Sequence, residues 1–310
     1  MLATLGNRWS RAATAVAAVF ALSFAPLSLA QEEQPEAEDD GAKAVWQAAF
    51  AAMVHGPTTV ELKDQAQLAL PEGYGFVPPK QGAALMDTLG NTTDERFIGL
   101  IFPEAEESSW FVTMDYEPSG YIKDDDAKEW DADELLQNLK DGTEAANEHR
   151  RDIGVTELEV TRWVEKPAYD AQAHRLVWSA EAREKGVPDQ DPVVNYNTYV
   201  LGRQGYVSLN LITNSSTVEA DKPAAHQLLE AVNFNDGKRY GDFNESTDKV
   251  AAYGLAALVG GLAAKKLGLL AGLGVLIAKF AKVIIAVVVG AGAAITKWFK
   301  GRGGGDAAQA

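Results

Sequence analysis

The sequence predicts an α+β domain, a mainly antiparallel sheet with flanking helices, followed by a C-terminal Gly/Ala-rich transmembrane helical segment. Three observations support this prediction. Strand patterns outnumber helical ones in the body of the chain, and few strand–helix–strand units recur, which favours antiparallel pairing. Residues 202–205 join two strand patterns as a hairpin loop. From Val250 to Ile295 the chain is almost wholly apolar, as expected of a segment that lies in a bilayer.

The first half of the body opens with a helix. Residues 31–41 are acidic and contain Pro35, so we expect a disordered spacer there. Helical spacing of apolar residues begins near Ala42, and Gly56 with Pro57 ends the helix. Pattern and turn residues then predict four strands and one short helix. The strands are expected at 58–62, 67–70, 97–102 and 110–116, and the helix at 81–89.

The second half of the body opens with the clearest helix. Asp131 and Glu134 have the spacing of a capping box, and acidic residues fill the first turn, where the helix dipole favours them. Gly154 is a plausible end. After it, the patterns predict four strands and a last helix. The strands are expected at 157–163, 174–180, 193–201 and 206–213, and the helix at 223–232.

The N-terminus resembles a secretory signal peptide. Arg8 and Arg11 precede an apolar run, and small residues up to Ala30 provide a cleavage site. We therefore expect residues 1–30 to be removed and the mature chain to begin near Gln31. The alternative is an uncleaved N-terminal anchor. The folded domain is then expected to occupy residues 42–247.

Charged residues, like apolar ones, are distributed unevenly along the chain. The whole chain has a net charge of −16, and this charge lies in the body. An acidic domain repels nucleic acid, so we expect no nucleic-acid partner. The C-terminal part is basic, which fits the tendency of Lys and Arg to stay on the cytoplasmic side. We therefore predict a bacterial inner-membrane protein whose main domain lies in the periplasm and, having no Cys, folds without disulfides.

Residues 248–300 are the predicted membrane region, and 301–310 a disordered tail. The apolar stretch is too long for one crossing and barely long enough for two. Either a crossing begins at Val250 and turns at Lys265, or the stretch from Lys265 to Lys282 lies along the interface and Val283–Ile295 crosses. Small residues spaced by four would permit self-association of such helices. The residues assigned to the membrane are Gly260, Gly268, Gly272, Lys265, Lys266, Lys279, Lys282 and Trp298.

Several motifs resemble a family of bacterial membrane-anchored proteins known as domain of unknown function 2167. They include 70–74 (LPEGY), 99–103 (GLIFP), 120–126 (GYIKDDD), 147–150 (NEHR) and 248–251 (DKVA). The resemblance implies location and architecture, and it brings no established reaction, cofactor or catalytic residue. The stretch 206–234 is also similar to the ends of photosystem-associated PsbP-like domains, which favours a single sheet with flanking helices.

A ligand-binding surface is predicted on the strand 195–199 (NYNTY). Asn is depleted in strands because it competes for backbone hydrogen bonds. Asn195 and Tyr196 could therefore line a recognition surface, with Arg203 at the loop; the alternative is an edge strand with one wet face. Tyr121 and Lys123, from the motif at 120–126, complete the predicted ligand-binding set.

Signals for metal binding and catalysis are weak. The acidic run from Asp124 fails the EF-hand pattern, because its sixth position is Glu129 and its twelfth Leu135. A looser cation site would use Asp124 and Asp126; the alternative is a solvated turn that leads into a helix. No HExxH, nucleophile elbow or Cys nucleophile is present, so we predict no cofactor and no catalytic residue.

The predicted function is a membrane-anchored periplasmic recognition or scaffold protein of the bacterial envelope. Its expected partners are membrane lipid, an envelope protein and, through the tail, further copies of itself. Two alternatives stay open. One is an envelope hydrolase that uses carboxylates, since an acidic chain offers many carboxylate pairs. The other is an oligomeric membrane element formed by the Gly-rich tail.

Overall fold

The computed structural model describes residues 36–105, 108–152, 154, 156–187 and 191–260. The chain divides into two compact units, Met1–Asp40 and Gly41–Ala310, and the description below concerns the second. Helix α2 (Glu36–Ala51) crosses the border between them. It begins inside the stretch that we expected to be disordered, so that expectation is wrong for residues 36–41. The predicted signal peptide and residues 31–35 lie outside the described residues.

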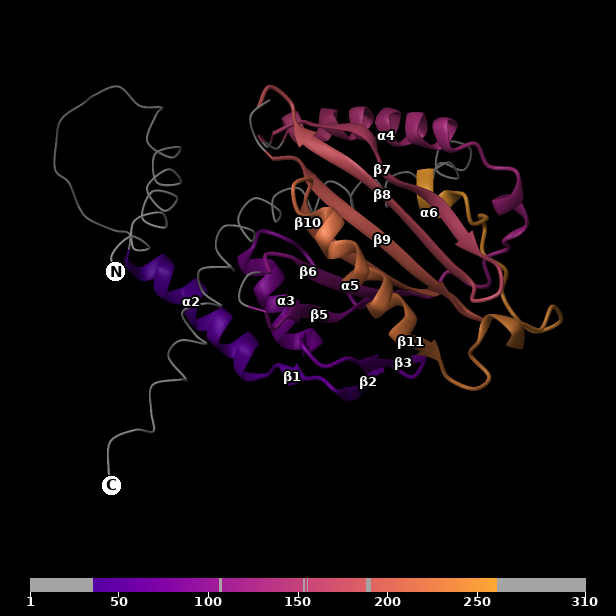
Figure 1. The fold of residues 1–310 in the computed structure, drawn as a ribbon, viewed down its shortest axis with the longest axis horizontal. Helices are drawn as coiled ribbons and strands as arrows, with labels where there is room; N and C mark the ends of the chain where they lie inside the picture. The colour runs from indigo at the N-terminus through magenta and orange to yellow at the C-terminus, as the bar shows by residue number, and fades with distance from the viewer. Residues whose placement is uncertain (1–35, 106–107, 153, 155, 188–190, 261–310) are drawn as a thin grey trace, which may run out of the picture. The chain divides into compact units, whose positions relative to one another are not determined.

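An eight-stranded antiparallel sheet is the framework of this unit (Figure 1). The α+β prediction is therefore confirmed. The hairpin predicted at 202–205 joins two central strands, whose register pairs Tyr206 with Leu201 and Asn214 with Val193. In spatial order the strands are β1 (Val54–His55), β4 (Tyr74–Val77), β5 (Phe97–Pro103), β6 (Phe111–Glu117), β10 (Tyr206–Asn214), β9 (Val193–Leu201), β8 (Arg175–Glu184) and β7 (Leu158–Asp170).

A second sheet of three strands was not predicted as a unit. Its order is β11 (Val232–Phe234), β3 (Ala66–Leu70) and β2 (Thr58–Leu62). The sequence indicated β2 and β3, but β11 is too short to show a strand pattern. Leu68 of β3 and Val232 of β11 are fully buried in the same apolar cluster as the centre of the large sheet. The small sheet therefore covers part of one face of the large one.

Helix α5 (Val218–Ala231) covers more of that face, which we call the α5 face (Figure 1). It begins before Pro223, where the sequence had placed its start, and keeps the proline inside the helix. Leu228 and Leu229 of α5 pack in one continuous cluster with Leu209 and Leu211 of β10. This cluster is the main apolar core of the domain.

The opposite face, which we call the α4 face, carries two separate apolar clusters. One joins α2 and α3 (Pro79–Thr88) to strands β4, β5, β6 and β10. The other joins α4 (Ala132–Asp152) and α6 (Ala257–Gly260) to β8 and β9. Register shows that both lie on one face. Ile212 of the first cluster is directly opposite Asn195, and Asn195 is directly opposite Ala180 of the second, and directly opposed side chains share a face.

Asp131 caps helix α4 as predicted. Its Oδ1 accepts hydrogen bonds from the backbone N–H groups of Asp133 at 2.8 Å and Glu134 at 3.2 Å. Two donors at the helix start are thereby satisfied. Leu135 and Leu139 then face the sheet, so the cap fixes where the apolar side of the helix begins.

The folded domain extends beyond the boundary expected at Thr247. Val250 forms a bridge with Tyr121, and Leu255 and Leu258 are buried in the α4/α6 cluster. The indole N–H of Trp178 donates to the Leu258 carbonyl at 3.0 Å. The first residues of the apolar stretch therefore complete the core of the domain, and the arrangement in which a crossing begins at Val250 does not fit this packing.

Candidate functional site

A band of polar side chains separates the two clusters of the α4 face. Asn210 of β10 is directly opposite Asn197 of β9 and Thr113 of β6. Directly opposed residues have Cβ atoms about 5 Å apart, so these side chains are neighbours. On each strand, the residues two positions away have their side chains on this same face of the sheet. The polar band consists of Thr113, Asp115, Asn195, Asn197, Ser208 and Asn210.

Buried oxygen atoms in this band lack hydrogen-bond partners. Among the residues that the structure describes, Thr113 Oγ1, Asn195 Oδ1 and Asn210 Oδ1 are buried and make no hydrogen bond. Thr113 is only 1 % exposed. Each such group costs about 1–3 kcal/mol of desolvation unless a water or a ligand bonds to it, so three in one place mark this part of the sheet as a candidate site.

Asp115 adds a perturbed carboxyl group to the band. It lies two residues from Thr113 on the same face of β6, opposite Ser208. Burial raises the pKa of its carboxyl to about 6, and the positive charge of Arg96 opposes that shift. Arg96 is itself held by Asp94 and, at 2.8 Å, by Glu117. Within the described part of the chain, no hydrogen bond or ion pair reaches the Asp115 carboxylate.

The structure divides the predicted recognition strand between the two faces. Asn195 lies in the polar band, whereas Tyr196 points to the α5 face and is fully buried. The Tyr196 hydroxyl donates to Glu165 Oε2 at 2.6 Å and lies 2.8 Å from His226 Nε2. Burial raises its pKa above the ordinary tyrosine value. Tyr196 therefore ties α5 to the sheet and does not share an exposed surface with Asn195.

Arg203 is engaged in an ion pair inside the domain. Its Nε and a terminal nitrogen donate to both oxygens of Asp248, at 2.7 and 2.9 Å. Arg203 also donates to the Gly237 carbonyl at 3.2 Å. Hydrogen bonds from Arg203 and from the Asn244 backbone hold the pKa of Asp248 well below its usual range. The pair fastens the β9–β10 hairpin to the segment before α6, which is a structural role.

Tyr121 belongs to a stack of aromatic rings at the same end of the sheet. Its ring centroid lies 3.9 Å from that of Phe243 and 4.4 Å from that of Tyr240. Tyr240 in turn stacks on His174 at 4.1 Å. Lys123, two residues on, is exposed. The structure therefore does not bring Tyr121 or Lys123 to the polar band, and their ligand-binding role stays a prediction.

The two metal candidates make hydrogen bonds to protein groups. Asp124 Oδ2 accepts from the Tyr169 hydroxyl at 2.8 Å. The carboxylate of Asp126 accepts from the backbone N–H groups of Leu255 and Ala256, at 3.1 and 3.0 Å, and so positions the start of α6. In the part of the chain described, no three His, Asp or Glu side chains come together as a metal site would require.

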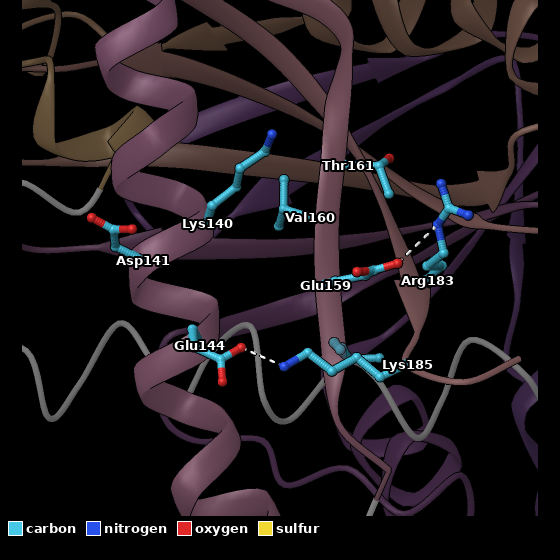
Figure 2. A pocket seen from close by; sticks show the side chains of 9 residues that line it. Lys140, Asp141, Glu144, Glu159, Val160, Thr161, Arg183 and Lys185 are labelled. Carbon is cyan, nitrogen blue, oxygen red and sulfur yellow. Dashed lines mark hydrogen bonds and ion pairs between the residues drawn. The ribbon is translucent and has the colours of Figure 1, made fainter. Parts of the chain in front are cut away.

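A hollow of about 670 Å³ lies between helix α4 and strands β7 and β8 (Figure 2). Two ion pairs lie in its lining: Lys185 Nζ is 2.5 Å from Glu144, and Arg183 Nε is 3.3 Å from Glu159. The Lys185 ammonium lowers the pKa of Glu144. A carboxyl group shifted in that direction is a poor general acid at neutral pH, so the hollow does not favour acid–base chemistry.

The residues assigned to the membrane lie almost entirely outside the described part of the chain. Gly260 is the exception. It ends α6, and a Cβ atom there would lie 3.0 Å from Leu135 of α4, so its small size serves packing inside the domain. Gly268, Gly272, Lys265, Lys266, Lys279, Lys282 and Trp298 lie beyond it. None of the helices in the described ranges is long and apolar enough to span a bilayer.

Sequence reasoning found two of the six residues of the polar band and missed the other four. The amide-rich strand 195–199 indicated Asn195 and Asn197. Thr113, Asp115 and Asn210 looked like ordinary polar positions of alternating strands, because only the order of β6, β10 and β9 in the sheet places them beside those amides. The one local sign of their role was that each of these polar residues stands between two apolar residues of its own strand.

The fold and the polar band define a protein of the α+β class with one large antiparallel sheet and a polar strip on its α4 face. The chain belongs to the family described as "Protein of unknown function (DUF2167)", which matches residues 54–292. The resemblance stated from the motifs is thereby confirmed.

Solved structures give distant likenesses. The solution structure of PsbP (CyanoP) from Synechocystis sp. PCC 6803 is 11 % identical, with a TM-score of 0.35, and covers 60 % of this chain and 94 % of its own. The Ran-binding protein Mog1p of Saccharomyces cerevisiae is 12 % identical, with a TM-score of 0.33 and coverages of 58 % and 96 %. Such scores carry no argument about function. A search of curated proteins found no match.

Proposed function

We propose that this chain is a membrane-anchored recognition or scaffold protein of the bacterial envelope, with residues 42–260 as a periplasmic binding domain. The observation that carries the proposal is the polar band, whose buried acceptor oxygens have no hydrogen-bond partner among the residues described. Groups of this kind are costly in a domain that only has to fold, and they are common where a protein binds something.

The sequence supports the location. A signal-like N-terminus, an acidic body and a basic, apolar C-terminus fit an exported domain held at the inner membrane. Because the folded domain includes residues up to Gly260, the anchor is proposed to begin after that residue. The interfacial arrangement of Lys265–Lys282 followed by a crossing at Val283–Ile295 is the one that stays compatible with the fold.

Cell fractionation tests the location. The full-length protein is expected in the membrane fraction after a high-salt wash, and its domain should be digested by protease added to spheroplasts. Recovery as a soluble monomer without detergent would overturn the proposal.

Affinity capture of the tagged protein tests recognition. Partners retained by the wild type should be lost from a variant with Asn195→Ala and Asn210→Ala and kept by Glu72→Gln, an exposed position far along the chain from the band.

A hydrolase is the second candidate, and one observation favours it. Asp115, whose pKa is raised to about 6, and Glu117, which is ion-paired with Arg96, lie on one strand face. Residues two apart in a strand are separated by about 7 Å, and two carboxyls in unlike environments are the pattern of acid–base pairs. Release of reducing ends from purified cell-wall glycan, abolished by Asp115→Asn and by Glu117→Gln, would support this reading. No release by the wild type excludes it for that substrate.

A further inference from the structure

We propose that the polar band binds a primary ammonium group, and this inference rests on the recognition function proposed above. The band offers hydrogen-bond acceptors that have no donors. Thr113 Oγ1, Asn195 Oδ1 and Asn210 Oδ1 are buried without partners among the described residues. An alkylammonium carries three donors and no acceptor, so it satisfies several such oxygens at once.

A negative charge near these oxygens also favours a cationic ligand. The Asp115 carboxylate lies beside Thr113 on the same strand face and has no hydrogen-bonded partner in the described ranges. A desolvated carboxylate without a partner is expensive, and a paired one much less so. The charged groups that act on Asp115 are Arg96 and Lys63, which favour its ionised form, and Asp94 and Glu117, which oppose it. The guanidinium of Arg96 is already shared between those two acids.

Aromatic rings border the carboxylate end of the band. Tyr199 of β9 is directly opposite Ser208, and its ring centroid lies 5.6 Å from that of Tyr206. Ring faces attract cations, so aromatic rings beside the carboxylate are compatible with a bound ammonium. An anion would meet Asp115 and Glu117 in an acidic domain. A calcium ion would find one carboxylate, fewer than it usually requires.

The ammonium can come from a free alkylamine or from this chain. Helix α6 ends at Gly260 on the α4 face, and Lys265 and Lys266 follow five and six residues later. A chain of that length reaches up to about 17–20 Å. The two sources share one recognition chemistry, and the experiment below separates them.

Isothermal titration calorimetry of the full-length protein in detergent micelles tests the proposal, with putrescine as the probe and 1,4-butanediol as its uncharged match. At pH 7.5 the wild type is expected to bind putrescine and not butanediol. Asp115→Asn should weaken binding at least tenfold, and Glu72→Gln should not change it. Lowering the pH to 5 should weaken wild-type binding about tenfold, because a carboxyl with a pKa of about 6 is then mostly protonated.

A second arm tests the source. If lysines of the chain fill the band, the wild type will not bind putrescine, but a variant with Lys265→Gln and Lys266→Gln will, and adding Asp115→Asn will abolish that binding. Either pattern supports the ammonium site. Absence of binding by both proteins, or equal binding of butanediol, overturns it. In that case, recovery of the Asp115→Asn variant in the membrane fraction would still support the membrane-anchoring part of the proposed function.

Discussion

The two faces of the large sheet solve the same packing problem in different ways. On the α5 face, one apolar cluster runs without interruption from β4 to β8 and is closed by α5 and the small sheet. On the α4 face, helices cover the two ends and polar side chains occupy the middle. Strands β6, β9 and β10 contribute to both faces, so the difference lies in the side chains and not in the backbone. The continuous core of the α5 face supplies stability, and the binding function that we propose falls on the α4 face.

Neighbouring residues of β10 allow the sharpest test of this contrast. Leu211 points into the α5 cluster and is 1 % exposed, so Leu211→Ala should destabilise the protein by about 3 kcal/mol through lost burial and a cavity. Asn210 points to the polar band, and its Oδ1 has no hydrogen-bond partner within the described part of the chain. Asn210→Ala should therefore change the free energy of unfolding by less than about 1 kcal/mol. Denaturant unfolding of both variants in one detergent measures the difference, and equal losses would show that the faces do not differ.

Asp115 should destabilise the unliganded fold at neutral pH. Its pKa in the folded protein, about 6, lies above its ordinary value of 3.8, so the folded state favours the protonated form. The stability associated with that proton is fully present below about pH 4 and is lost as the pH rises through 6. Asparagine mimics the protonated group.

Asp115→Asn is thus expected to raise the unfolding free energy on the order of 2 kcal/mol at pH 7.5 and to change it little at pH 4. Thermal unfolding at the two pH values, without added amine, measures both quantities. A loss of stability at pH 7.5 would mean that a partner outside the described residues already neutralises the carboxylate.

The sequence was sufficient for the parts of the fold that local pattern controls. The β9–β10 hairpin and the Asp131 cap follow from turn and capping chemistry within a few residues, and both were predicted. The end of the domain was not, because Val250–Gly260 is as apolar as a membrane segment and only contacts far along the chain, with Tyr121, Asp126 and Trp178, show that it packs in the core. Likewise, two of the six residues of the polar band were predicted from one unusual strand. Thr113 and Asn210 join it only through the order of strands in the sheet, which no local pattern encodes.

Two threonines of equal burial provide the finest comparison of the faces. Thr113 and Thr198 are each 1 % exposed, but Thr198 Oγ1 donates to the Leu209 carbonyl at 3.0 Å, whereas Thr113 Oγ1 makes no hydrogen bond in the described structure. Replacement by valine keeps the shape and removes the hydroxyl. Thr198→Val should cost about 1 kcal/mol, while Thr113→Val should be neutral or stabilising by a similar amount. Should Thr113→Val prove the more costly of the two in urea unfolding, its hydroxyl must have a partner in solution, and the polar band would be satisfied without a ligand.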